Sequence, residues 1–528
     1  MNVFSYRVVC LLWLIIPSAL VAVPVSIISQ LPFTISLPGL YVLSDNISFS
    51  TTNTAITINS DKVVLNLNGK TIGATVSSTN GIAILSGSTT TTRQHIVIKN
   101  GSLIGFDGFG VTGSGTQYSD IKVQDITVIG VAGTSTGISF ANTTDSVFER
   151  CRSVNNFLGA QFTSCHEVDI NASHFNNNNG TDGVFGLTAT SCSNFTLIDC
   201  TMNNNVATNA ASGGAMGMNL TGTGTNWVCK NCTFNNNTAG GTGASFSRGL
   251  NASSHHTCRL LDCSFNDNST TNTFSSGNGS TAGAFLTTCS AWHIEGCDFL
   301  RNSVGGGTAA ANGANVTNGG SHFIGRCNFS NNVSSEPTAA GFCLGLVFNN
   351  ATCCEIRDSI AKGNTINSST SFCYGFRLDG QGSRSNSFYN CRAVGNVGGT
   401  GTMNGYDLSG TSSDNSFVQC SAIGQIGATS RGFAINSGCT ANAFHQCQAL
   451  GNGTNGFIDS NSAGQNSYTG CLAARNVTNY TAGVIRFITI SETTDANFDF
   501  NTNGACFGAA PSAGSFINTD IFANYSIV

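Results

Sequence analysis

Four stretches near the C-terminal end decide the fold: NSFYNC at 386–391, NSFVQC at 415–420, NAFHQC at 442–447 and NSYTGC at 466–471. Each ends on a cysteine, which we call the anchor. Asn, an aromatic residue and a third residue stand five, three and one positions before it. This period of two predicts a β-strand that leads up to each anchor.

The unit recurs along most of the chain. Fifteen anchors follow one another at intervals of 22 to 34 residues, at Asn68, Asn100, Asp125, Cys151, Ser173, Cys200, Cys232, Cys263, Cys297, Cys327, Ser359, Cys391, Cys420, Cys447 and Cys471. A second alternating segment, such as 375–378 or 405–408, lies 15 or 16 residues upstream of its anchor. A short third strand follows the anchor. Strands this short, with no helix between them, must pair with the next turn, which predicts an all-β parallel solenoid of about 15 turns.

Composition supports this architecture and excludes others. Charged residues make up only 9% of the 528, whereas Gly alone numbers 63. A helical fold lacks its usual surface residues, and a chain that is 40% hydrophobic with a net charge of -5 is not a disordered polyelectrolyte. Because no Lys/Arg cluster is present, we expect no nucleic-acid partner.

The N-terminal residues have the pattern of an export signal. Arg7 precedes the apolar run 8–16, and Pro17, Ser18 and Ala22 follow. We predict a signal peptide over 1–22, no membrane span after its removal, and a secreted or cell-surface protein. The predicted parts of the mature chain are an N-terminal cap at 23–60, the parallel β-helix at 61–489 and a C-terminal turn and cap at 490–528.

Stacked turns place equivalent residues above one another. Phe388, Phe417, Phe444 and Tyr468 then form an inward aromatic stack, and Asn386, Asn415, Asn442 and Asn466 form a ladder of bonded amides. The 22 cysteines in an exported chain suggest disulfides. Because most recur once per turn and side chains in register point the same way, we instead predict buried free thiols.

The chain resembles a known superfamily. LPFTISLPGLYVLSDNISF at 31–49 and AITINSDKVVLNLNGKTI at 55–72 are similar to the first turns of right-handed parallel β-helix proteins of the pectin-lyase-like superfamily. The segments 234–237, 265–268, 299–302 and 329–332 resemble the F-x-x-N element of chlamydial polymorphic outer membrane proteins, and 213–216 resembles their G-G-A-I element. The resemblance implies a right-handed coil.

Catalytic candidates gather at two neighbouring turns. Polysaccharide lyases and hydrolases on this fold resemble one another in clustering carboxylates with a cation on one exposed face. The candidates here are His255, His256, Arg259, Asp262, Glu295 and Asp298. A solvated polar loop explains the same residues. Arg326 and Asp358 form a second candidate pair, whose ordinary interpretation is a surface ion pair. Cys229 and Cys232 form a C-x-x-C in inward positions, so we expect no metal and no cofactor.

Three functions remain. The leading hypothesis is a noncatalytic, adhesin-like protein that binds glycan or a host surface through loops rich in Asn, Ser and Thr between about 176 and 320. The alternatives are a polysaccharide lyase or glycoside hydrolase, and a structural or trimeric fibre element. The fibre alternative implies a homo-oligomer.

Overall fold

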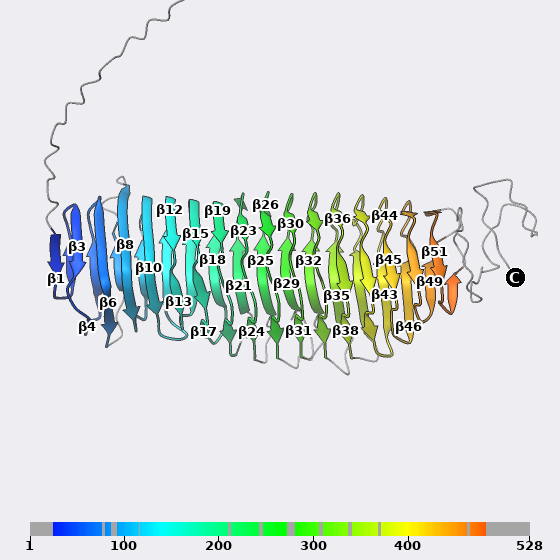
Figure 1. The fold of residues 1–528 in the computed structure, drawn as a ribbon, viewed down its shortest axis with the longest axis horizontal. Coiled ribbons are helices and arrows are strands. Elements are labelled where there is room, and N and C mark those ends of the chain that lie inside the picture. The colour runs from blue at the N-terminus through cyan, green and yellow to red at the C-terminus, as the bar shows by residue number, and fades with distance from the viewer. Residues whose placement is uncertain are drawn as a thin grey trace, which may run out of the picture.

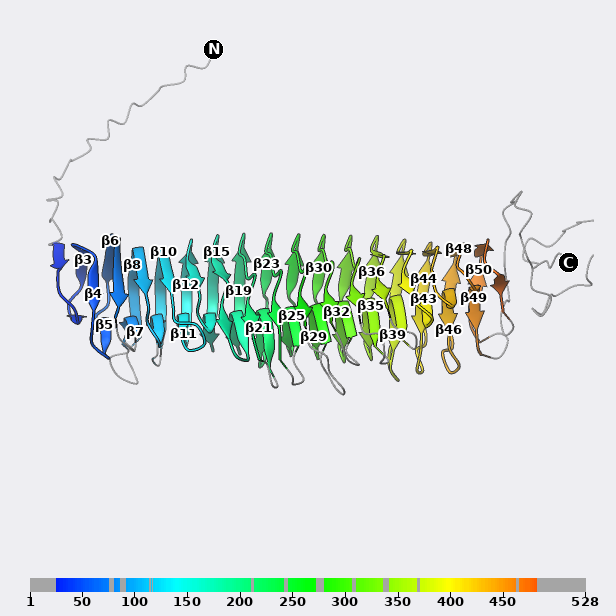
Figure 2. The same ribbon diagram turned by 90° about the horizontal axis from the view of Figure 1, so that it is seen from below.

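The protein is a straight rod of stacked β-strand turns (Figures 1 and 2). The computed structural model describes residues 25–481, except 76–79, 86–91, 114, 116, 210–212, 242–245, 272–279, 306–309, 336–340, 368–370 and 462–464. The predicted signal peptide at 1–22 and C-terminal cap at 490–528 lie outside these residues. The described residues form 52 strands.

Sheet 1 runs the length of the rod and contains 17 strands. They are β2 (Phe33–Ile35), β5 (Thr54–Ile58), β7 (Asn80–Ile84), β9 (Phe109–Gly113), β11 (Thr136–Ala141), β14 (Leu158–Thr163), β18 (Val184–Thr190), β21 (Gly214–Thr221), β25 (Phe246–Ser253), β29 (Ser280–Thr287), β32 (Ala310–Thr317), β35 (Phe342–Asn349), β39 (Phe372–Asp379), β43 (Thr402–Leu408), β46 (Thr429–Ile435), β49 (Asn455–Asp459) and β52 (Thr478–Tyr480).

Sheet 2 holds the strands that lead up to the anchors, of which β6, β8 and β10 continue past theirs. They are β1 (Val25–Ile28), β3 (Gly39–Leu43), β6 (Val63–Ala74), β8 (Arg93–Ile104), β10 (Tyr118–Ile129), β12 (Thr143–Glu149), β15 (His166–Asn171), β19 (Ser193–Ile198), β23 (Val228–Lys230), β27 (Arg259–Leu261), β30 (His293–Glu295), β33 (Phe323–Gly325), β36 (Glu355–Arg357), β40 (Ser387–Tyr389), β44 (Ser416–Val418), β47 (Ala443–His445) and β50 (Ser467–Thr469).

Shorter strands complete each turn. Those that follow the anchor, here sheet 3, are β4 (Ile47–Phe49), β13 (Arg152–Val154), β16 (His174–Asn176), β37 (Ile360–Lys362), β41 (Arg392–Val394), β45 (Ser421–Ile423), β48 (Gln448–Leu450) and β51 (Leu472–Ala474). Sheet 4 consists of β17 (Asn179–Gly180), β20 (Val206–Ala207), β24 (Thr238–Ala239), β28 (Ser269–Thr270), β31 (Ser303–Val304), β34 (Val333–Ser334), β38 (Thr365–Ile366) and β42 (Val397–Gly398). A further pair is β22 (Gly224–Thr225) with β26 (His255–His256).

The pairing confirms the predicted parallel β-helix. Each strand of sheet 1 pairs in parallel with the strand one turn later, as β25 does with β29 and β29 with β32. The repeat units align as the sequence pattern predicts, because Phe388 pairs with Phe417 and Phe417 with Phe444. Sheet 1 contributes one strand to each successive turn among the described residues.

The core contains the predicted aromatic and sulfur ladders. Phe388, Phe417, Phe444 and Tyr468 stack with successive ring centroids 4.9 Å apart. The twenty cysteines in the described part of the chain are free thiols, and all except Cys353 are buried. The anchor thiol of Cys232 donates to the carbonyls of Lys230 at 3.3 Å and Leu197 at 3.5 Å. In-register stacking therefore satisfies these thiols without disulfides.

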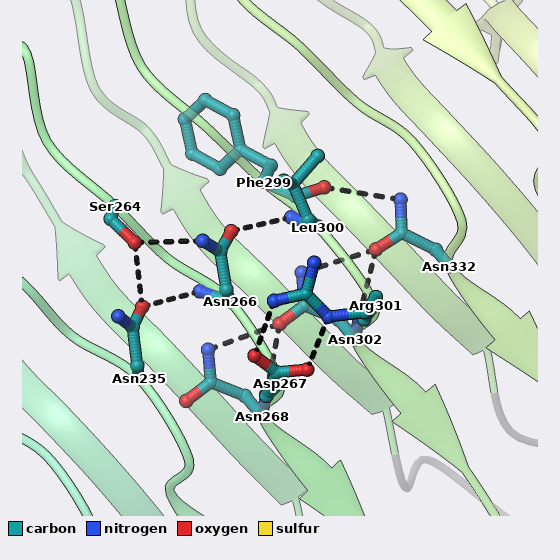
Figure 3. A network of polar contacts seen from close by, with 10 residues as sticks. All are labelled: Asn235, Ser264, Asn266, Asp267, Asn268, Phe299, Leu300, Arg301, Asn302 and Asn332. Carbon is teal, nitrogen blue, oxygen red and sulfur yellow. Dashed lines mark hydrogen bonds and ion pairs between the residues drawn. The ribbon is translucent and has the colours of Figure 1, made fainter.

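Two buried amide ladders run along the rod. The predicted one is confirmed: Asn386 Nδ2 donates to Asn415 Oδ1 at 3.0 Å, and the pattern continues to Asn466. The longer ladder lies five residues after the anchors. Its side chains bond head to tail at 2.8 to 3.1 Å through Asn178, Asn205, Asn237, Asn268, Asn302, Asn332, Asn364, Asn396 and Gln425. Figure 3 shows it from Asn268 to Asn332.

The residue before each of these amides adopts the left-handed backbone conformation, with a positive φ. Asn236, Asp267 and Arg301 occupy it with φ of 57°, 57° and 54°. Asn and Asp tolerate this conformation better than most residues. Arg301 adopts it while its Nε and Nη2 hold the two carboxylate oxygens of Asp267, each at 2.7 Å (Figure 3).

Candidate functional site

The outward face of sheet 2 carries a charged group around Glu295. His293 Nε2 lies 2.9 Å from Glu295 Oε2, and Arg326 Nη1 lies 2.9 Å from Oε1. Phe323 stacks on His293, with ring centroids 4.7 Å apart and planes 22° apart. The hydrogen bond from His293 and the charge of Arg326 lower the pKa of Glu295. Glu295 is therefore ionised at neutral pH and unsuited to donate a proton there.

The structure separates the six predicted catalytic residues. Only Arg259 and Glu295 share a face, because Arg259 pairs in register with His293 on the neighbouring strand. Asp262 is exposed at the corner before its anchor, with φ of 52°. Asp298 comes just after its anchor, where it bridges Ser264 and Asn328 on the face of sheet 3. These two carboxylates therefore lie on different sides of a corner.

The two predicted histidines lie away from that face. His255 is 0% exposed, its Nδ1 lies 2.8 Å from the Ser253 carbonyl oxygen, and its ring meets Trp227 edge-on at 6.2 Å. Burial lowers the pKa of His255. His256 is half-buried, with Nδ1 2.7 Å from Ser290 Oγ. His255 is thus a core residue, which the alternation of inward and outward positions explains.

The proposed pair of Arg326 and Asp358 has other partners. Arg326 binds Glu295 of the preceding turn, and Asp358 Oδ1 accepts a hydrogen bond from Asn390 Nδ2 at 2.8 Å. Cys229 and Cys232 are buried, as predicted. Among the described residues, no group of three or more His, Cys, Asp or Glu side chains is placed to hold a metal ion.

A second group, which sequence reasoning missed, lies on the outward face of sheet 1. We call it the Arg377 group; its members are Phe342, Phe372, Tyr374, Arg377, Asp379, Asn404 and Asp407. Arg377 Nη2 lies 3.0 Å from Asp379 Oδ2, and its Nε lies 3.4 Å from Asp407 Oδ2. The guanidinium carbon lies 5.0 Å from the ring centroid of Tyr374 and 5.3 Å from that of Phe342.

Asp407 is the buried member of the Arg377 group, with a side chain only 3% exposed. Its Oδ1 accepts from Asn404 Nδ2 at 2.8 Å and from Asn436 Nδ2 at 3.3 Å. Burial raises the pKa of Asp407, while Arg377 opposes that shift. Both oxygens of this carboxylate have protein partners. The group is therefore built to hold its shape rather than to exchange a proton.

The signal for the Arg377 group was present in the sequence. Arg377 and Asp407 occupy the same position of consecutive turns, within the segments 375–378 and 405–408. Opposite charges at one position of adjacent turns indicate a cross-strand ion pair.

Comparisons with known proteins give no family. No family model and no curated protein matches the chain. The resemblance to chlamydial polymorphic outer membrane proteins therefore stays a prediction.

Several solved structures are similar in shape. The A-module of the mannuronan C-5 epimerase AlgE4 of Azotobacter vinelandii is 13% identical with a TM-score of 0.39, covering 72% of this chain and 90% of its own. The surface adhesin PfbA of Streptococcus pneumoniae is 10% identical with a TM-score of 0.34, covering 67% and 84%. The Dettilon tailspike protein is 12% identical with a TM-score of 0.30, covering 77% and 61%. At these values none decides the function of this chain.

Within the described residues no helix has the length and apolar character needed to cross a membrane.

Proposed function

We propose that this chain is an exported, noncatalytic protein that binds glycan at the Arg377 group of sheet 1. The observation that carries the proposal is the stacking of Phe342 and Phe372, with ring centroids 5.7 Å apart, beside an arginine fork. Saccharide sites combine aromatic rings for the apolar face of a sugar with a few fixed polar groups for its hydroxyls. In a chain with 9% charged residues, it is unusual that three charged side chains and three aromatic rings gather on one outward face.

The carboxylates of the two charged groups support the proposal of binding without catalysis. Glycoside hydrolysis uses a pair of carboxyl groups, one of which exchanges a proton with the leaving group or water. Asp407 is bonded by Asn404, Asn436 and Arg377, and Asp379 is bonded by Arg377 and by Ser409 Oγ at 2.9 Å. Glu295 on sheet 2 is held by Arg326 and His293. These carboxylates are positioned as fixed acceptors, which suits recognition.

The test measures retention and cleavage together. The mature chain is passed over immobilised neutral and acidic polysaccharides, and new reducing ends are measured in parallel. We expect retention without new reducing ends. Release from any substrate would contradict the noncatalytic proposal and favour the lyase or hydrolase alternative. A stable trimer in light scattering, with no retention, would favour the fibre alternative.

A matched pair of variants locates the site. Arg357 on sheet 2 has the same chemistry as Arg377, since it pairs with Glu355 and lies 4.8 Å from the ring centroid of Tyr389. We expect Arg377→Gln to weaken retention at least tenfold and Arg357→Gln to leave it unchanged. The opposite pattern would place the site on sheet 2.

A further inference from the structure

The N-terminal end of the rod exposes apolar side chains to solvent. Val25 and Ile27 of β1 are 51% and 58% exposed, and Leu37, in the loop before β3, is 70% exposed. Figure 1 shows β1 and β3 at one end of the rod. Eight large hydrophobic side chains are exposed in the described part of the chain. Three of them lie within these 13 residues, which marks this end as an interaction surface.

The apolar surface continues from β1 onto the outward face of the next strands. Val25 pairs with Leu40 of β3, and Leu40 pairs with Val64 of β6. Ile27 pairs with Val42 in the same way. The residues on either side of Val42 and Val64 along their strands are buried, so these two side chains face outward. We call this surface the N-terminal patch; its members are Val25, Ile27, Leu37, Leu40, Val42 and Val64.

Lysines border the N-terminal patch on the side of the later turns. Val64 pairs with Val97 of β8, and Val97 pairs with Lys122. Lys99 lies two residues after Val97, on the same face of β8. Residues 23–106 contain four Lys or Arg and two Asp, whereas the whole chain contains 21 Lys or Arg and 26 Asp or Glu. This end of the rod therefore carries a net positive charge, although the protein as a whole is acidic.

The sequence that precedes the N-terminal patch is also apolar and uncharged. No Asp, Glu, Lys or Arg stands between Arg7 and Asp45, and the apolar run 8–16 belongs to this stretch. An apolar run of this kind directs a chain to a membrane during export. Val25 follows the run by only nine residues. The N-terminal patch is therefore the part of the rod that export brings next to a lipid bilayer.

The strands at this end are poorly suited to pair with a strand of another chain. Each of the first three is directly preceded by a proline, which is Pro24 before β1, Pro32 before β2 and Pro38 before β3. Proline and short strands are the devices by which natural proteins prevent pairing at a sheet edge. Recognition at this end therefore depends on side chains, which suits a fluid apolar surface better than a second copy of the rod.

We propose that the N-terminal patch docks on the surface of a lipid bilayer. Val25, Ile27 and Leu37 enter the boundary between headgroups and acyl chains, and the bordering lysines lie at the level of anionic headgroups. Lys122 Nζ lies 3.5 Å from Glu149 Oε2, whereas Lys99 forms no ion pair among the described residues. Lys99 is therefore the lysine that is available to a phosphate group of the lipid.

The experiment measures flotation of the mature chain with two kinds of vesicle, phosphatidylcholine alone and phosphatidylcholine mixed with phosphatidylglycerol. We expect the chain to float with both and to bind the mixed vesicles more tightly. The double variant Ile27→Asp, Leu37→Asp should weaken binding to both kinds at least tenfold. Ile426→Asp is the control, because Ile426 is 60% exposed but lies far from the N-terminal patch, and it should leave binding unchanged. Equal melting temperatures of the variants exclude unfolding as the cause.

A second pair of variants tests the lysines. Lys99→Gln should weaken binding to the mixed vesicles about fivefold and leave binding to the neutral vesicles unchanged. Lys230→Gln is its control, because Lys230 occupies the same row of sheet 2 five turns later and should change neither. A wild-type chain that floats with neither kind of vesicle would overturn the inference, as would equal losses in the double variant and in Ile426→Asp. A dimer in light scattering that Ile27→Asp, Leu37→Asp abolishes, without vesicle binding, would assign the patch to a second copy instead.

Discussion

The backbone N–H of Trp292 donates to Nδ1 of His322 at 3.2 Å. This contact fixes Nδ1 of His322 as an acceptor, so its ring is neutral with the proton on Nε2. The ring is 1% exposed, and burial lowers the pKa of His322 to about 4. His322 of the folded protein therefore takes up a proton only near pH 4, whereas in the unfolded chain it does so near pH 6.5.

Acid should destabilise the rod through His322. The contribution of His322 is complete above about pH 6.5 and is lost as the pH falls towards 4, by about 3 kcal/mol in the free energy of unfolding. The measurement is urea unfolding at pH 7 and pH 4.5, followed by the fluorescence of Trp227 and Trp292.

The matched variant for this test is His322→Asn, because Asn386 fills the equivalent position two turns later. It should remove most of the difference in unfolding free energy between the two pH values. An unchanged pH dependence in His322→Asn would assign the acid sensitivity to other groups.

Removing one amide side chain from the long ladder should lower the stability of the rod. Asn302 Oδ1 accepts from both the N–H and the Nδ2 of Asn268, at 3.2 and 3.0 Å. Asn302→Ala leaves two buried donors unpaired and should cost about 2 to 4 kcal/mol in denaturant unfolding. Ala at the exposed Asn179 is the control and should cost less than about 0.5 kcal/mol. Equal losses in the two variants would show that the ladder carries no special stability.

The glycines of sheet 1 set how closely successive turns approach. A Cβ added to Gly313 would lie 2.5 Å from the carbonyl oxygen of Gly345, a backbone atom that cannot move aside alone. Gly313→Ala should therefore cost about 2 kcal/mol in the free energy of unfolding, which in a chain of this length lowers the melting temperature by about 2 °C. Gly73→Ala meets nothing within 4 Å and should leave the melting temperature nearly unchanged. A mild effect at Gly313 would mean that the turns can separate locally.

The thiols should react according to burial. Burial raises the pKa of both Cys151 and Cys354 to about 12, so few thiolates form at neutral pH. In the native protein we expect Cys353 to react rapidly with a thiol reagent, and Cys353→Ser to remove one equivalent from the fast phase. In denaturant without reductant most of the 22 cysteines should react. Reaction of fewer than a third would contradict the free-thiol assignment.

Periodicity was sufficient to predict the fold but not the site. The spacing of Phe388, Phe417 and Phe444 predicts parallel register, because identical positions must stack when strands pair between turns. The same spacing says little about which outward side chains meet, since that depends on corner geometry and side-chain length. The repeat pattern predicts His255 and Asp298 on turns near Glu295, yet His255 points inward and Asp298 lies beyond the corner. The Phe246 and Phe285 pair around Arg248 joins two turns whose separation in sequence hides the contact.

The long amide ladder also has a direction and a break. From Asn178 to Asn396 each side chain donates to the amide of the next turn, towards the C-terminal end, whereas Gln425 turns its Nε2 back to the carbonyls of Ala393 and Ile423, at 2.9 and 3.1 Å. The series resumes beyond it, because the N–H of Gln425 donates to Asn452 Oδ1 at 3.2 Å and Asn452 Nδ2 donates to Asn476 Oδ1 at 3.0 Å. Whole turns inserted between Asn178 and Asn396 would find a donor on one side and an acceptor on the other, so the rod is a modular scaffold that can be lengthened in one orientation.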